Sequence, residues 1–378
     1  MKKIISFMKQ ETVLSVALFL AVISTFIIPP DAEYLDYIDF RTLAILFCLM
    51  SVMAGLREIG VFEAMAQKML GKVKNVRQVI LILIMLCFFS SMFITNDVAL
   101  ITFVPFTFIV LNLLSLEEKE KWMVPVVVMQ TIAANLGSML TPIGNPQNLY
   151  LYGKSGISLD SFIGLMLPYT ALSFLLLCIF VAIKGKSSKE KIHVTFEKMV
   201  HITEKKKLVL YLCLFLCSLF TVARIVPYGI SLFLTIACIL VIDRKILSKV
   251  DYCLLLTFVG FFVFIGNMGR VEVFHAFLEK VIEGREVITA ALASQVISNV
   301  PAALLLSGFT QETEALIIGT NLGGLGTLIA SMASLISYKF VVREKRSLKK
   351  KYFLYFTGAN VVFLAILMCL YGIIFLFF

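Results

Sequence analysis

A single carboxylate, Asp97, lies inside a long apolar stretch that carries no other charged side chain between Arg77 and Glu117. If this stretch enters a membrane, a charge near the midplane costs at least ~2.5 kcal/mol, so the residue is expected to have a function or a partner. A carboxylate in such a place could coordinate a cation or exchange a proton. The competing interpretation is structural, because Asp favours the N-terminus of a helix.

The residues around Asp97 occur twice in the chain. The passage Ile94–Ala99, which reads ITNDVA, returns as ISNVPA at Ile297–Ala302, with Val300 in the place of Asp97. The second copy interrupts the apolar run Val287–Gln311 near its middle and leaves two arms of about 11 residues, or about 16 Å of helix. Each arm is half of a ~30 Å hydrocarbon core, so two arms that meet at a polar tip predict a re-entrant hairpin.

By the same repetition, Gln78–Leu116 is predicted to form a matching hairpin with Asn96 at its tip. The arms of this hairpin are longer, so two complete membrane spans are the alternative from length alone. Because Val300 has no titratable group, the two tips are predicted to differ chemically.

A second polar passage is also repeated, since Asn135-Leu136-Gly137 returns as Asn321-Leu322-Gly323. The run Trp122–Gly153 around the first copy holds further residues that interrupt a helix, namely Pro142, Gly144, Asn145, Pro146, Gln147 and Asn148. A continuous lipid-facing helix does not tolerate this set, so a break is predicted near Gly137–Pro146, with a Pro-kinked packing helix as the alternative. Freed carbonyls there could bind a cation, and the N-terminus of the next half-helix could bind an anion. The second copy lacks both prolines, so its break is predicted to be gentler.

The composition requires a membrane around these motifs. Hydrophobic residues make up 60% of the chain and charged residues 15%, and the mean hydropathy is +0.96. A soluble domain cannot bury that much apolar surface. The net charge of +10 does not indicate nucleic acid, because the basic residues cluster between the apolar runs. The sequence shows no nucleophile set and no Cys/His metal set, so neither an enzyme nor a metal cofactor is expected.

The basic loops predict the topology. Lys184–Lys207 holds eight Lys against three Glu, and Arg343–Lys351 holds six Lys or Arg against one Glu. Placing these loops in the cytoplasm gives about nine spanning helices, an inside N-terminus and an outside C-terminus. Asp39–Leu70 aligns without gaps to Asp251–Ile282, and the two copies then have opposite topology. The expected fold is therefore an all-α membrane protein, an inverted-repeat transporter with two re-entrant hairpins and two broken helices.

This topology divides the chain into four predicted parts. They are an N-terminal helix and outer loop (1–38), a first inverted repeat (39–183), a cytoplasmic linker with a helical hairpin (184–250) and a second inverted repeat (251–378).

At these motifs the chain resembles an ion transporter superfamily. Its members include citrate-transporter-like permeases, divalent anion:sodium symporters, arsenite efflux pumps and sodium/proton antiporters. The resemblance covers about residues 39–378 and rests on three passages: Thr95–Ala99 followed by Pro105, Thr141–Asn148, and Ser298-Asn299 followed by Pro301. In the dicarboxylate symporters each tip reads Ser-Asn-Thr, whereas the third position here is Asp97 in one tip and Val300 in the other. The Asp at this position resembles the arsenite and antiporter branches.

The resemblance implies roles for particular residues. One cation or proton site would comprise Thr95, Asn96, Asp97, Asn135 and Gly137, and its mirror would comprise Ser298, Asn299, Asn321 and Gly323. The substrate would lie between the two sites, against Asn96, Thr141, Gly144, Asn145, Asn299 and Thr327. No metal is implied beyond sodium.

The function expected from the sequence is secondary active transport of a small anion such as citrate, a dicarboxylate or an inorganic oxyanion, coupled to sodium or protons. Arsenite or antimonite efflux and sodium/proton antiport are the alternatives. The expected partners are the substrate, the lipid bilayer and a second copy in a homodimer, without nucleic acid. The expected location is a prokaryotic plasma membrane.

Overall fold

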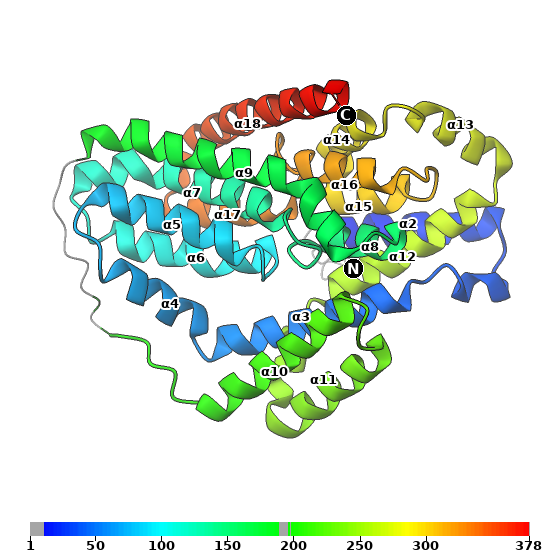
Figure 1. Ribbon diagram of the computed structural model, residues 1–378, viewed down its shortest axis with the longest axis horizontal. Helices are drawn as coiled ribbons and strands as arrows, with labels where there is room; N and C mark the ends of the chain where they lie inside the picture. Colours follow the sequence, from blue (N-terminus) through cyan, green and yellow to red (C-terminus); the bar gives the residue numbers. More distant parts are fainter. Residues whose placement is uncertain (1–10, 189–195, 197, 378) are drawn as a thin grey trace.

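The computed structural model describes residues 11–188, 196 and 198–377, and these residues form helices and connecting turns without a β-strand. The longer helices run along the long axis of the molecule (Figure 1). Within these described ranges, four segments are long and apolar enough to cross a membrane, and five further apolar helices are shorter. The four are Ala32–Glu58, Leu159–Lys184, Tyr252–Gly269 and Arg346–Leu376. The all-α class is therefore confirmed, while the number of spans and the four-part division stay predictions. The described residues do not include residues 1–10 of the first predicted part or residues 189–195 and 197 of the linker.

The first half of the chain contains the first copy of each polar passage. Its elements are α2 (Thr12–Ile27), η1 (Ala32–Leu35), α3 (Phe40–Glu58), α4 (Val61–Leu70), α5 (Val76–Ser90), α6 (Asn96–Leu111), α7 (Leu116–Ser138), α8 (Pro146–Ser155), α9 (Leu159–Lys184) and η2 (Gly185–Ser187).

The second half begins after a helical hairpin. The hairpin consists of α10 (Lys205–Val222) and α11 (Tyr228–Ile242), followed by η3 (Arg244–Lys249). The remaining elements are α12 (Tyr252–Gly269), α13 (Glu272–Ile282), α14 (Glu286–Ile297), α15 (Asn299–Leu306), α16 (Thr313–Leu322), α17 (Met332–Glu344), η4 (Arg346–Leu348) and α18 (Lys349–Phe377).

The aligned segments Asp39–Leu70 and Asp251–Ile282 fold into the same pair of helices. Asp39 caps α3 by accepting a 2.9 Å hydrogen bond from the Thr42 amide, and Asp251 caps α12 by accepting one of 2.9 Å from the Leu254 amide. In both copies a shorter helix follows at once, α4 in the first and α13 in the second. A carboxylate at the N-cap stabilises a helix by ~1 kcal/mol, so both copies start their long helix by the same device.

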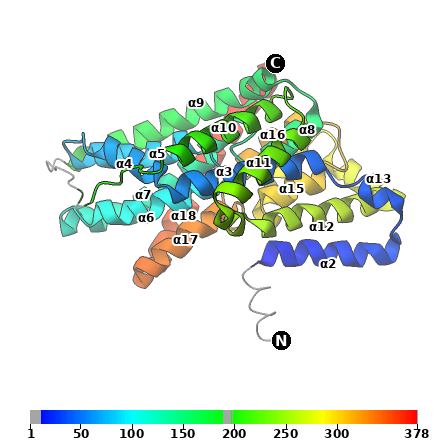
Figure 2. The same cartoon turned by 90° about the horizontal axis from the view of Figure 1, so that it is seen from below.

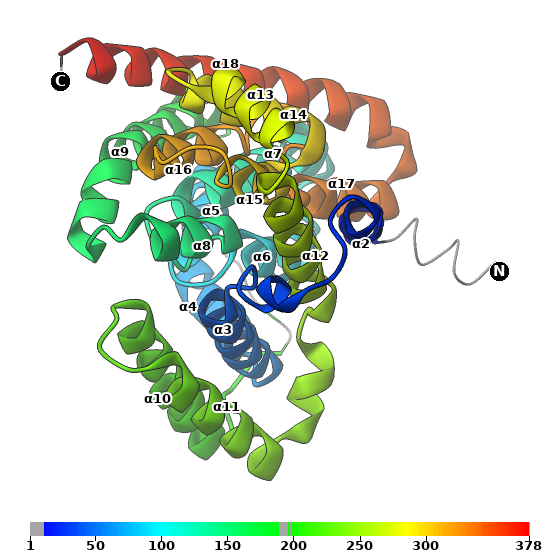
Figure 3. The same cartoon turned by 90° about the vertical axis from the view of Figure 1, so that its right-hand side faces the viewer.

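The outer helices pack on this framework at two places. The helix α2 lies along α12, and the hairpin of α10 and α11 lies against α3 (Figures 2 and 3). The crossing of α3 and α10 is close, because a Cβ placed on Gly55 would lie 2.4 Å from the Tyr211 ring. Both polar passages lie between these outer layers, near the centre of the molecule.

Both predicted breaks are present, at the predicted places. Residues 139–145 separate α7 from α8, and residues 323–331 separate α16 from α17. The expectation that the second break would be gentler is wrong, because its non-helical segment is the longer of the two. The second break lacks the two prolines, and it has Gly324 and Gly326 where the first copy has Ser138 and Leu140. Gly326 has a φ of +107° that an L side chain rarely adopts.

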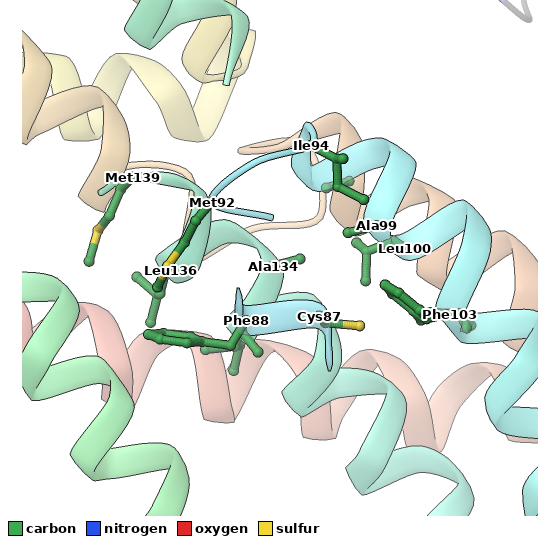
Figure 4. Packing of buried hydrophobic residues seen from close by; sticks show 14 of the residues in the cluster. Cys87, Phe88, Met92, Ile94, Ala99, Leu100, Phe103, Ala134, Leu136 and Met139 are labelled. Carbon is green, nitrogen blue, oxygen red and sulfur yellow. The ribbon is translucent and has the colours of Figure 1, made fainter. Parts of the chain in front are cut away.

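The polar tips lie at the helix junctions. Residues 91–95 join α5 to α6, and Ser298 alone separates α14 from α15. Apolar side chains from three helices surround the first turn, as Figure 4 shows for Cys87, Phe88, Met92, Ile94, Ala99, Leu100, Phe103, Ala134, Leu136 and Met139. The polar backbone of the turn is therefore enclosed by hydrocarbon, where an unpaired amide or carbonyl is costly.

Glycines allow each broken helix to approach the first arm of its hairpin. A Cβ on Gly137 would lie 2.0 Å from the Phe88 carbonyl oxygen, and one on Gly323 would lie 2.8 Å from the Ala291 Cα. The neighbouring serines, Ser91 and Ser294, also lie within 2.9 Å of those positions. Two segments 186 residues apart therefore use the same close helix crossing, which only glycine permits.

Substitution of Gly137 by Ala is expected to lower the thermal unfolding midpoint of the purified protein. The added methyl group meets the backbone of α5, and overpacking of this kind costs about 1–3 kcal/mol. Gly164→Ala, on α9, is the matched control, since nothing lies within 4 Å of its added Cβ. The control should be neutral or slightly stabilising, because Ala is the better helix former. Equal midpoints for the two variants would contradict the close crossing.

Candidate functional site

Each hairpin tip is hydrogen-bonded to a helix break through the backbone. The amide N–H of Asn96 donates to the Gly144 carbonyl at 3.2 Å, and the amide N–H of Asn299 donates to the Ala330 carbonyl at 3.0 Å. Gly144 follows Asn135 at the same spacing as Ala330 follows Asn321. The two copies of the motif therefore make the same contact at the same position.

Thr141 and Thr327 link the two helix breaks to the two hairpins by hydrogen bonds. The Thr141 hydroxyl donates to the Met92 carbonyl at 2.5 Å, and the Thr327 hydroxyl donates to the Gln295 carbonyl at 3.0 Å. Met92 precedes Asn96 by the same number of residues as Gln295 precedes Asn299, so this contact is also repeated. Both hydroxyls are thus engaged with backbone, although the sequence pointed to substrate binding for them.

Buried asparagines join the first break to the second half of the chain. Asn135 accepts hydrogen bonds from the Asn96 side-chain amide at 2.9 Å and from the Ser331 hydroxyl at 3.1 Å. Its own side-chain amide donates to the Gly324 carbonyl at 3.4 Å. Asn135 is 3% exposed, and it is therefore a buried centre at which one tip and both breaks meet.

Asn321 makes the corresponding contact from the other side. Its side-chain oxygen accepts a 3.4 Å bond from Asn145, and its amide donates to the Asn148 side chain at 2.6 Å. Asn145 and Ser331 both stand directly before a half-helix, α8 or α17. Among the described residues no hydrogen bond joins Asn299 to Asn321, so the side-chain bond between Asn96 and Asn135 has no counterpart at the second tip.

Thr95, rather than Asp97, caps α6. The Thr95 hydroxyl accepts from the Val98 amide at 3.5 Å, and the Asp97 amide is itself bonded to the Asn96 side chain at 2.9 Å. The Asp97 carboxylate has one oxygen that is buried and makes no hydrogen bond within the described residues. Asp97 is therefore not the N-cap of α6, but it lies in the first turn of this helix, where the helix dipole favours an acidic residue.

Asp97 lines a cavity of about 130 Å³ between α3, α6 and α12. Arg57, Lys249 and Asp251 line the same cavity, together with apolar side chains of α3. Lys249 is also paired with Glu58. The carboxylate therefore faces a small polar space that a water molecule or an ion could enter.

A second cavity, of about 250 Å³, reaches the other tip. Val300 and Pro301 line it, and it shares Asp251 and Leu254 with the first cavity. Val300 stands where the first copy has Asp97, so the two tips present a carboxylate and an isopropyl group to neighbouring spaces. The predicted chemical asymmetry is present in the geometry.

Ser298 holds a strained backbone at the second tip. Its φ of +75° and ψ of +153° lie in a region that is otherwise almost reserved for glycine, at a cost of order 1–3 kcal/mol. The Ser298 hydroxyl donates to the Ala330 carbonyl at 3.4 Å, which is the acceptor that the Asn299 amide also uses. Strain of this kind is typical of residues whose conformation is fixed by a functional site.

Some residues of the site were not in the predicted set. Gln295 donates to the Gly323 and Leu325 carbonyls at 2.9 and 2.8 Å and accepts from the Thr327 amide, so it holds the second break open. Gln147 is buried and has no hydrogen-bond partner for either side-chain atom within the described residues. A lone Gln in an apolar run was the available signal for Gln295, whereas Gln147 stands among the polar residues of the first break.

The arrangement offers neutral ligands for ions. Buried amide oxygens can coordinate a cation, and the N-termini of α6, α8, α15 and α17 converge at the breaks with amide N–H groups that can bind an anion. Gly137 and Gly323 contribute close packing. Groups of three or more His, Cys, Asp or Glu that could hold a metal are absent from the described residues.

Known proteins resemble this chain over most of its length. A family profile described as citrate transporter matches residues 4–315. A protein of Methanocaldococcus jannaschii named as an uncharacterized transporter is 34% identical, over 81% of this chain and 82% of its own. An inner membrane protein of Escherichia coli is 31% identical, over 80% of each chain. A silicon efflux transporter of rice is 31% identical over 38% of this chain and 28% of its own.

Substitution of Asn135 by Leu is expected to destabilise the protein strongly. The change removes the partner of Asn96 and of Ser331, and each buried polar group left without a partner costs about 1–3 kcal/mol. Thermal unfolding in detergent measures the effect. Asn360→Leu is the matched control, because within the described part of the chain the buried Asn360 side chain bonds only to the Phe356 carbonyl of its own helix. A similar small shift for both variants would show that Asn135 does not join the breaks.

Proposed function

The chain belongs to the citrate transporter family, and from this premise we propose that it is a secondary active permease for a small anion such as citrate, a dicarboxylate or an inorganic oxyanion. Membership of this family makes the protein an integral membrane transporter and not an enzyme. The proposed driving force is a gradient of sodium or protons.

One observation carries the proposal: the same polar junction of hairpin tip and helix break occurs twice, and the two junctions touch. Irregular backbone at membrane depth is tolerated where protein or water surrounds it, and transporters place substrate and coupling ions at such discontinuous helices. The contacts of Asn135 with Ser331 and of Asn145 with Asn321 support a single site between the two halves.

The proposed architecture is an inverted repeat. The pair α5 and α6 and the pair α14 and α15 would be re-entrant hairpins, and about nine other spans would carry the chain from an inside N-terminus to an outside C-terminus. The equal contacts of the two copies support a repeat, and the basic segments beside α9 and α18 support the orientation. Alternating access would then move one helix bundle against the other.

Coupling is proposed to take place at the first tip. Thr95, Asn96 and Asp97, with the Asn135 oxygen, would hold a sodium ion or a proton, and Ser298 and Asn299 near Asn321 would form a weaker second site. One charge that moves through 100 mV supplies ~2.3 kcal/mol, which sustains roughly a 50-fold gradient. The unpartnered Asp97 oxygen and the cavity in front of it support this assignment.

The substrate is proposed to lie between the tips, against Asn96, Asn145 and Asn299. The side-chain oxygen of Asn145 and both polar atoms of Gln147 have no hydrogen-bond partner among the described residues, so they can turn toward a bound molecule. The N-termini of α8 and α17 would favour a negatively charged one.

Substitution of Asp97 by Asn is expected to abolish ion-driven accumulation of substrate in proteoliposomes while the fold is retained. The amide has nearly the same shape, but it carries no charge and does not titrate near neutral pH. Uptake is measured under imposed sodium and proton gradients, and counterflow exchange reports on transport that needs no gradient. Asp160→Asn, at the exposed start of α9, is the control and should accumulate substrate normally. Full ion-dependent accumulation by the Asp97 variant would refute its role.

A second candidate is efflux of arsenite or antimonite, and the partial match to a transporter named for silicon efflux favours it. A neutral hydroxide species would need amide ligands and no fixed cation, and the buried asparagines supply such ligands. Sodium/proton antiport is a third candidate, which the single carboxylate Asp97 supports.

A ligand screen separates these candidates. A bound substrate stabilises the native state by about 2.7 kcal/mol at 100 times its Kd, so the thermal unfolding midpoint should rise with the correct ligand. The protein is tested against citrate, succinate, sulfate, phosphate and arsenite, with and without sodium. We expect one of the anions to stabilise the protein and the shift to disappear in Asn145→Ala. Stabilisation by arsenite alone would select efflux, and stabilisation by sodium alone would select antiport.

A further inference from the structure

A groove of about 430 Å³ lies beside α18, and none of the residues of the two polar tips line it. Its lining residues come from α7, α9 and α18. These three helices pack against one another (Figure 1). The lining is apolar and includes Met129, Phe180, Leu354, Gly358, Val362 and Phe363.

Gly358 keeps the groove open. Nothing lies within 4 Å of a Cβ placed on this residue, so its surface is open space rather than a helix contact. One turn away on either side, Leu354 is 61% exposed and Val362 is 56% exposed. The floor is Met129 of α7, which is buried. A flexible hydrocarbon chain fits a hollow of this kind better than a rigid helix, which would leave the gap at Gly358 empty.

Cationic side chains gather at one end of the groove. The Lys184 ammonium lies 4.8 Å from the Tyr355 ring and 5.8 Å from the Phe180 ring, and both rings line the groove. The ammonium groups of Lys121 and Lys184 lie 5.9 and 5.7 Å from the centre of the Trp122 ring. Burial lowers the pKa of Lys184, and the positive charge of Lys351 at the start of α18 adds to this effect.

The carboxylate nearest to these cations is already engaged. Glu118 accepts hydrogen bonds from Trp122 at 2.9 Å, from Ser188 at 2.6 Å and from Lys121 at 3.2 Å. Lys184 also donates to the Tyr355 hydroxyl at 3.3 Å. Counted over the described residues, three lysines and one glutamate lie near the mouth, so positive charge exceeds negative charge there. The groove is thus apolar along its length and positive at the end that carries the basic segments of the chain.

From this combination we propose that the groove binds one anionic phospholipid. An acyl chain lies along α18 over Gly358, and the headgroup phosphate lies at the mouth between Lys184 and Lys351. Anionic lipids are attracted to basic residues at the cytoplasmic membrane surface, and long lysine side chains reach the headgroup level from within the bilayer. The lipid joins α7, α9 and α18, so it stabilises the packing of the last helix. This site is independent of the transported substrate.

The test uses the full-length protein, purified in detergent and stripped of lipid. Native mass spectrometry is used to titrate it with phosphatidylglycerol and with phosphatidylcholine of the same acyl chains. We expect phosphatidylglycerol to bind about tenfold more tightly, because two lysines face its net charge. Inorganic phosphate is tested separately by thermal shift and should stabilise the protein less than the phospholipid does.

Two variants and two matched controls locate the site. Gly358→Trp fills the groove without meeting protein atoms near its Cβ, and it should remove the tight phosphatidylglycerol binding. Gly164→Trp, on the exposed face of α9, should leave binding intact. Lys184→Gln should reduce the preference for phosphatidylglycerol, and Lys206→Gln, at the exposed start of α10, should not.

Equal affinities for the two phospholipids, or unchanged phosphatidylglycerol binding by Gly358→Trp, would overturn the proposal. Stabilisation by inorganic phosphate as large as that by the phospholipid would also overturn it, since the apolar groove would then play no part.

Discussion

The need to satisfy backbone hydrogen-bonding groups within hydrocarbon governs the centre of this molecule. Two interrupted helices and two hairpin turns expose amides and carbonyls in an interior where each unpaired group costs several kcal/mol. The chain resolves this by placing each turn against a break, so that Asn96 donates to Gly144 and Asn299 to Ala330. The close glycine crossings and the threonine contacts of the same regions follow from that arrangement, because they hold turn and break at hydrogen-bonding distance.

Contacts within each half differ in kind from contacts between the halves. Inside a half, backbone groups take part in every repeated hydrogen bond. The links between the halves include asparagine and serine side chains, at 2.6–3.4 Å. Backbone pairs are positioned by whole helices, while a side chain can turn to a new partner with little cost. A turn and its break are therefore suited to move together, and the seam between the halves is suited to open for a substrate.

The sequence predicted the elements whose signals are local. Prolines, glycines and amides located the first break, and the repeat located the second. The alignment of the two copies agrees with the hydrogen bonds, because Asn96 and Asn299 bond to carbonyls at equivalent positions of the two breaks. It failed where the outcome depends on three-dimensional neighbours. The length of the second break follows from three glycines and from Gln295, which binds two of its carbonyls. The engagement of Thr141 and Thr327 with hairpin carbonyls also requires knowledge of which turn lies beside which break. The division into parts, the number of spans and the roles of the site residues stay predictions.

The hydrogen bond between each hairpin tip and its helix break is made by main-chain atoms, so the side chains at the tips can differ between the two copies. A residue at the third position of either tip is not needed to hold the junction, so one copy can keep Asp97 while the other has Val300 on the same scaffold. The two halves can therefore carry different side chains at the neighbouring cavities without losing the architecture. A substitution at this third position alters the lining of a cavity and leaves the main-chain hydrogen bonds of the junction in place.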